Sequence, residues 1–155
     1  MKATKLVLVL IIIMFIGCQS KPKKEIVKTP PETIGLNFIN DYISNIGNLG
    51  MVEFIEENPS TTMKFKKTLK KMVDDAEKEA PGYGLGFDPV LDAQDYPDKG
   101  FNLQSIDTIA GYMRVVGRDW ESFVVTIKLI KENNKWMIDG CGMVNIPIDK
   151  QSSRD

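Results

Sequence analysis

Four aspartates crowd one short stretch, residues 88–100, which reads DPVLDAQDYPDKG. They are Asp88, Asp92, Asp95 and Asp98, spaced four, three and three residues apart. A calcium-binding loop needs oxygen ligands at fixed short offsets and a glycine at the bend, and this spacing does not fit that template. The chain has no histidine, so it also lacks the usual ligand of transition-metal sites and the usual base of Ser-His-Asp and Cys-His arrangements. We therefore expect no metal, no cofactor and no catalytic residues of those classes.

Acid–base chemistry by a carboxylate stays open as a hypothesis. An aspartate in an apolar pocket would have a pKa raised toward the useful range. Asp95 could then serve as the base, with Tyr42 or Tyr112 as hydrogen-bond donor to a developing negative charge. Tyr42 and Tyr112 are accordingly the candidate pocket residues of a small histidine-free enzyme.

The competing interpretation of the aspartate-rich stretch is structural, and we favour it. Asp88-Pro89 and Asp98-Lys99-Gly100 are common turn sequences, and Tyr96-Pro97 is a candidate cis peptide. Isolated charges are weak indicators of function. As a candidate binding loop, the stretch offers Asp88, Asp92, Gln94, Asp95, Tyr96 and Asp98.

Apolar periodicity predicts the helices that must position these residues. Leu36, Ile39, Ile43 and Ile46 recur every three or four residues, which predicts a helix that begins near Thr33. A second, short segment, MVEFIEE, ends at Asn58-Pro59, where we expect the cap and first residue of another helix. That helix should reach about residue 79 and bury Phe65, Leu69, Met72, Val73 and Ala76.

After residue 100 the apolar period changes to two, which predicts strands. Four runs qualify: FNLQSID, YMRVVG, ESFVVTIKLIKE and NKWMIDGCGMVNI. Asn133-Asn134 can adopt left-handed conformations and so connect the last two runs as a hairpin. Helices followed by an antiparallel meander predict an α+β fold, with two or three N-terminal helices packed on a curved antiparallel sheet of about four strands. We expect this single domain to span residues 33–147 and residues 148–155 to form a frayed tail.

The N-terminus predicts export and a lipid anchor. Lys2 and Lys5 precede an apolar run that ends at FIGC, which resembles the lipobox of bacterial lipoproteins. On that interpretation residues 1–17 are a signal peptide cleaved after Gly17, and Cys18 carries the lipid on a flexible tether of residues 18–32. A secretory peptide with a coincidental cysteine, or a signal anchor, is the alternative.

The net charge and the number of cysteines limit the classes of binding partner that we expect. Removal of the two N-terminal lysines leaves 18 basic residues (20 − 2) against 21 acidic ones, a formal charge of −3 that gives no reason to expect nucleic acid as a partner. Gln19 follows the lipidated cysteine, which favours the outer membrane over the inner membrane. The basic KPKK at 21–24 lacks acidic residues, which favours a domain that faces the periplasm over one at the cell surface. Cys141 is then alone, and its apolar neighbours predict that it is buried.

Two stretches, AQDYP at 93–97 and KWMIDG at 135–140, together with the lipobox, resemble the bacterial envelope proteins grouped as domain of unknown function 3828. The resemblance would cover residues 33–147 and implies a roll of the nuclear-transport-factor-2-like or cystatin-like type. It also implies that relatives carry a cysteine at the position of Asp92, able to pair with one near Cys141. This chain departs from that pattern.

Three functions are consistent with these features. The first is a non-catalytic envelope lipoprotein that binds a small ligand or a protein, with toxin immunity through the acidic loop 88–98 or the lysines of 64–71 as one version. The second is the enzyme described above. The third is support of an envelope assembly, in which Trp120 and Phe123 would be interface residues, although we expect Trp136 and Phe123 in the core. We favour the first.

Overall fold

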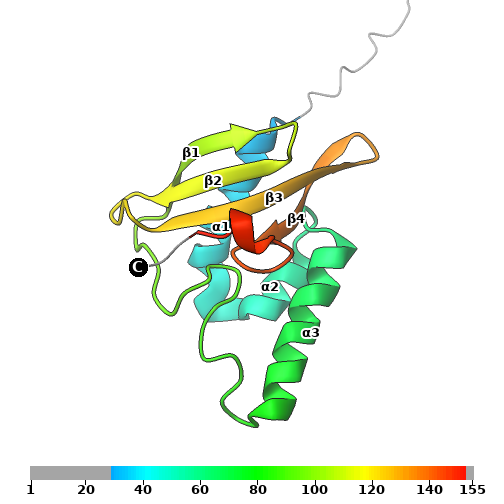
Figure 1. Ribbon diagram of the computed structural model, residues 1–155, viewed down its shortest axis with the longest axis vertical. Helices are drawn as coiled ribbons and strands as arrows, with labels where there is room; N and C mark the ends of the chain where they lie inside the picture. The colour runs from blue at the N-terminus through cyan, green and yellow to red at the C-terminus, as the bar shows by residue number, and fades with distance from the viewer. Residues whose placement is uncertain (1–28, 153–155) are drawn as a thin grey trace, which may run out of the picture.

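The computed structural model describes residues 29–152, which form one α+β unit (Figure 1). The predicted signal peptide, cleavage after Gly17, lipidation of Cys18 and most of the tether lie outside this range. Three helices precede four strands and a terminal 3-10 helix. Their bounds are α1 Pro31–Leu49, α2 Met51–Glu57, α3 Met63–Glu79, β1 Phe101–Asp107, β2 Tyr112–Gly117, β3 Val124–Glu132, β4 Lys135–Cys141 and η1 Ile148–Lys150. The predicted fold class is confirmed.

The strands form an antiparallel meander with the order β1-β2-β3-β4. The β3–β4 hairpin closes through Asn133 and Asn134, whose φ angles of 49° and 65° are both left-handed, as a two-residue hairpin turn requires. Alternate residues of the central strands are buried, among them Met113, Val115 and Ile127. These side chains define the face of the sheet that packs on the helices.

Helix α1 crosses this face and contacts all four strands. Its buried side chains include Phe38, Ile39 and Tyr42. Phe38 lies at the centre of an aromatic cluster, with ring centroids 6.2 Å from Phe54 of α2 and 6.1 Å from Phe65 of α3. One core therefore joins all three helices to the sheet. Among the described residues, no helix is both long enough and apolar enough to cross a bilayer.

Helix α3 begins later than the sequence predicts. Its N-cap is Thr62, whose hydroxyl accepts a hydrogen bond from Phe65 N at 3.1 Å. Asn58 instead accepts from Ser60 N at 2.8 Å and forms a turn. The prediction of a cap at Asn58 is wrong because Thr61 pairs with Ile138 of β4, and that pairing keeps the chain extended.

Two other local predictions are also wrong, the second one for the part of the tail that the structure describes. No cis peptide occurs in residues 29–152, so the Tyr96–Pro97 bond is trans. Residues 148–152 are not frayed: η1 forms there, Thr126 donates a hydrogen bond to Lys150 O at 2.7 Å, and Gln151 donates to Ile146 O at 2.9 Å. The segment is ordered because β3 supplies a polar side chain that satisfies its backbone.

Candidate functional site

The aspartate-rich loop is organised around Asp88. One carboxylate oxygen accepts hydrogen bonds from Val90 N at 2.7 Å and Leu91 N at 3.1 Å. The other accepts from the Tyr42 hydroxyl of α1 at 2.6 Å. Paired backbone bonds between Asp88 and Ala93 close the loop. Asp88 therefore caps a turn and attaches it to α1, which is the structural role that the sequence favoured.

Burial is the largest cause of the pKa shifts of Asp88 and Tyr42. It raises the pKa of the Asp88 carboxyl above its ordinary value, and the hydrogen bonds from Tyr42, Leu91 and Val90 oppose that rise. Burial, with the negative charge of Asp88 next, raises the pKa of Tyr42 far above its usual range. The Tyr42 hydroxyl thus stays protonated and acts as a donor.

The other members of the predicted binding loop do not converge. Asp95 and Asp98 are exposed, and Tyr96 is 37% exposed. Gln94 donates to Gly86 O at 3.0 Å, and Asp92 occupies a left-handed turn position with φ of 55°. Within residues 29–152, no three Cys, Asp or Glu side chains gather so that they could hold a metal ion.

The predicted pocket of Tyr42 and Tyr112 is not formed. Tyr42 is fully buried under the sheet, in contact with Asp88. Tyr112 alternates with the buried Met113, so its side chain lies on the opposite face of the sheet from the helices. Asp95 lines neither of the clefts described below. The structure therefore offers no shared cavity in which these three side chains could act on one substrate.

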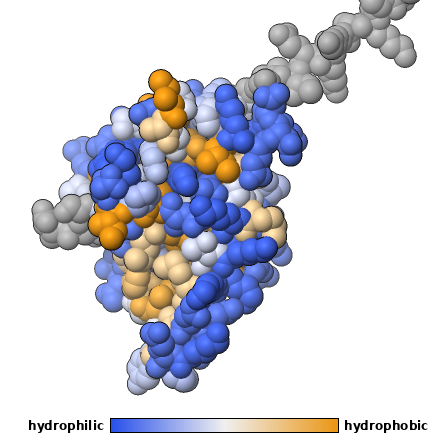
Figure 2. Space-filling view, turned by 45° about the vertical axis from the view of Figure 1, so that its right-hand side comes forward, coloured by the Kyte–Doolittle hydropathy of each residue, from blue (hydrophilic) through white to orange (hydrophobic). Residues whose placement is uncertain are grey.

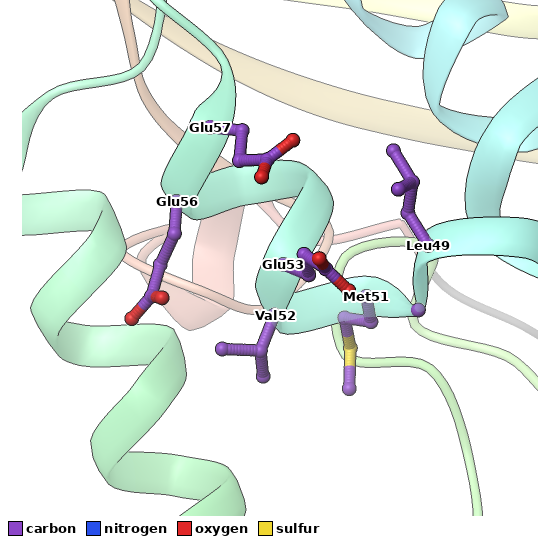
Figure 3. Close-up of a pocket in the computed structure, with 7 residues that line it drawn as sticks. Leu49, Met51, Val52, Glu53, Glu56 and Glu57 are labelled. Carbon is purple, nitrogen blue, oxygen red and sulfur yellow. The ribbon is translucent and has the colours of Figure 1, made fainter.

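One cleft lies at the junction of α1 and α2 (Figure 3). It is a wide-open depression of about 640 Å³, lined by a single segment of the chain, residues 49–57. Glu53, Glu56 and Glu57 belong to it, and Figure 3 shows their carboxylates pointing in different directions. Such a site neither encloses a ligand nor concentrates its charges on one point.

A second cleft, which we call the hairpin cleft, lies between α1 and the tip of the β3–β4 hairpin. Its volume is about 770 Å³, and three separate segments contribute to it. Ile34 and Phe38 of α1 and Trp136 and Met137 of β4 supply its apolar surface. Its polar surface comes from Thr29, Asn37, Asp41, Asn58, Ser60, Lys131, Asn133, Asn134 and Lys135. An apolar surface surrounded by many polar groups is the arrangement of protein–protein contact surfaces.

Exposed polar residues of α1 and a cation–π contact of the hairpin determine the chemistry of the hairpin cleft. Asn37 and Asp41 are exposed and one helical turn apart, so both face it from α1. On the hairpin, Lys131 Nζ lies 4.6 Å from the centroid of the Trp136 ring, a cation–π contact. Sequence reasoning missed this site because it assigned Trp136 to the core. Two lysines that flank an Asn-Asn turn next to a tryptophan were the available signal.

The structure also gives the positions of the other residues that the sequence singled out. Phe123 is 3% exposed, so it is a core residue, as the sequence led us to expect, whereas Trp120 is 45% exposed. The lysine-rich side of α3 is solvated, with a Lys70–Asp74 pair at 3.2 Å and a Lys71–Asp75 pair. Figure 2 shows hydrophilic side chains gathered along this helix. Cys141 is fully buried, as predicted.

Comparison of the chain with protein-family models, with curated proteins and with solved structures gave no match.

Proposed function

We propose that this protein is a lipid-anchored, non-catalytic binding module of the bacterial envelope, and that the hairpin cleft holds its partner. The observation that carries the proposal is the cleft itself. It has a volume of about 770 Å³ and is lined by three separate segments of the chain, whereas residues 49–57 alone line the other cleft. Anchoring through Cys18, at the outer membrane and facing the periplasm, is part of the same proposal and is supported by the lipobox-like sequence.

Binding fits the cleft better than catalysis. Its hydroxyl groups belong to Thr29 and Ser60, and the chain has no histidine that could activate them. Its charged groups, Asp41, Lys131 and Lys135, are all exposed. Exposed charges contribute to recognition and orientation of a partner, whereas acid–base catalysts commonly have a pKa tuned by burial or by a neighbouring charge. Toxin immunity is one version of this function, with the toxin as the partner.

The proposal is tested by native mass spectrometry of the protein isolated gently from envelope extract. Asn37→Phe would fill the cleft from α1 with a bulky side chain. Asn48→Phe makes the same change at an exposed position of α1 that lines neither cleft. We expect the wild type and Asn48→Phe to retain a discrete additional mass and Asn37→Phe to lose it. Equal retention by both variants, or no retained mass in the wild type, would overturn the proposal.

A further inference from the structure

The hairpin cleft opens onto an edge of the sheet. β4 is the last strand in the order, and residues 60–62 cover part of its outer edge. Ile138 N donates to Ser60 O at 2.7 Å, and Thr62 N donates to Ile138 O at 2.9 Å. The backbone groups of Ile138 therefore point away from β3 and are already paired.

Trp136 precedes Ile138 by two residues, so its backbone groups point in the same direction. The pairing of β3 with β4 leads to the same direction. The two-residue turn makes Glu132 and Lys135 the first hydrogen-bonded pair of the hairpin. Hydrogen-bonded and non-hydrogen-bonded pairs alternate, so the next pair, Lys131 and Trp136, is a non-hydrogen-bonded one. The N–H and C=O of Trp136 consequently point away from β3, toward the outer edge of the sheet, and Trp136 also lines the hairpin cleft. No segment within residues 29–152 pairs with β4 at this point.

The opposite wall of the cleft is α1, which presents Ile34, Asn37, Phe38 and Asp41. A groove between a helix and a free strand edge accepts an extended chain, because the edge supplies backbone hydrogen bonds and the walls accept alternate side chains. We propose that an extended peptide segment of a partner protein binds here as a fifth strand, paired with the backbone of Trp136. This inference rests on the proposed function and names the class of partner.

Charge indicates what the segment looks like. Lys131 and Lys135 lie at the hairpin end of the groove, so acidic side chains of the partner belong there, with an apolar side chain next to Trp136 and Phe38. A second copy of this chain is an unfavourable occupant, because pairing of two copies along this edge would bring their lysines together. Lysines on edge strands commonly prevent such self-pairing. The chain's own residues 18–28 are also mismatched, since they contain four lysines and one glutamate.

The test uses the full-length protein in detergent and a phage-displayed library of random heptapeptides. Selected peptides should combine acidic residues with an apolar one. Selective ¹⁵N labelling of tryptophan yields two backbone amide signals, and Trp120, outside the cleft, serves as the internal control. We expect a selected peptide to slow hydrogen exchange of the Trp136 amide by at least about tenfold and to leave that of Trp120 unchanged.

Matched charge reversals complete the test. Lys135→Glu should weaken binding of the selected peptides by about tenfold, because it replaces attraction by repulsion at the groove. Lys67→Glu, on the exposed side of α3, should change it by less than about twofold.

The other outcomes would overturn the inference in distinguishable ways. Failure to select any heptapeptide excludes a peptide ligand, and the retained mass that Asn37→Phe removes would still support the proposed function. Peptides that bind without protecting the Trp136 amide exclude strand addition. Protection without peptide that rises with protein concentration identifies a second copy, and protection that does not depend on concentration identifies the chain's own N-terminal segment.

Discussion

At the scale of single residues, Asp88 explains the aspartate-rich loop. Its carboxylate accepts three hydrogen bonds, two from the loop backbone and one from Tyr42. These donors compensate a partly desolvated charge, while burial still raises its pKa. The remaining aspartates of the loop have no such environment, because Asp95 and Asp98 are exposed. One half-buried residue with three partners, and not the density of acidic residues, determines the role of this segment.

Tyr42→Phe tests this arrangement. Removal of the hydroxyl deletes a hydrogen bond to a charged group, and we expect a loss of about 1.5–3 kcal/mol in the free energy of unfolding at pH 7. Tyr83→Phe, at a site that is 87% exposed, should have no measurable effect. Urea denaturation of both variants and the wild type measures the difference.

The free energy of unfolding of Tyr42→Phe should also depend on pH differently from that of the wild type. Because the folded pKa of Asp88 is raised, the stability linked to its protonation is fully present below the unfolded value of about 3.9 and is lost as pH rises through the folded pKa. Loss of the Tyr42 donor raises the folded pKa further. Tyr42→Phe should therefore recover part of its lost stability on acidification from pH 7 toward pH 4, relative to the wild type. A deficit that is independent of pH would contradict the assignment.

At the scale of elements, the loop after α3 is attached to the turn after β4. Met143 N donates to Pro89 O at 3.0 Å, and Gly142 N donates to Thr126 O at 3.0 Å. Gly142 has a φ of 62°, and a Cβ there would collide with the carbonyl oxygens of Pro89 and Val90. The two segments approach this closely because the turn residue has no side chain. This contact joins the irregular half of the chain to the sheet.

Gly142→Ala should therefore destabilise the fold by about 2–3 kcal/mol, from strain at a left-handed position together with a backbone clash. Gly86→Ala separates the two causes, because Gly86 also has a positive φ, 69°, but has open space around its Cβ direction. The control should lose only about 1 kcal/mol. Denaturant midpoints compare the variants, and equal losses would show that the contact with Pro89 and Val90 contributes nothing.

At the scale of the whole molecule, the proposed anchor places the hairpin cleft near the membrane. Thr29 lines the cleft and follows Cys18 by 11 residues (29 − 18). An extended chain of that length reaches at most about 40 Å. A partner that inserts a strand into the cleft must then lie within that distance of the lipid surface, which suits a protein of the same membrane.

Cys18→Ser tests the anchor. Lipid chains contribute about 0.8 kcal/mol for each buried CH₂ group, so their loss should release the protein from the membrane. We expect the wild type to incorporate labelled palmitate and partition into detergent, and Cys18→Ser to do neither. Cys141→Ala, which changes the other cysteine, should keep both properties. Palmitate incorporation by Cys18→Ser would exclude this cysteine as the lipidation site.

The sequence by itself determined the elements whose signals are local. The stripe of apolar residues in α1, the alternation in the strands and the Asn133-Asn134 turn each depend on neighbours within a few residues, so the α+β fold class could be predicted. The buried position of Cys141 followed from its apolar surroundings in the same way.

The tertiary structure decided what depends on contacts between distant segments. Because Thr61 pairs with Ile138, α3 begins later than its local sequence predicts. The hydrogen bond from Thr126 of β3 holds the segment at Lys150. The hydrogen bond from Tyr42 distinguishes Asp88 from the other three aspartates of the loop. The hairpin cleft belongs to the same class, because α1, the loop at 58–60 and the hairpin meet only in the folded chain. Local patterns carry no information on which distant backbone or side-chain group will satisfy a given polar atom, and that choice is made by packing.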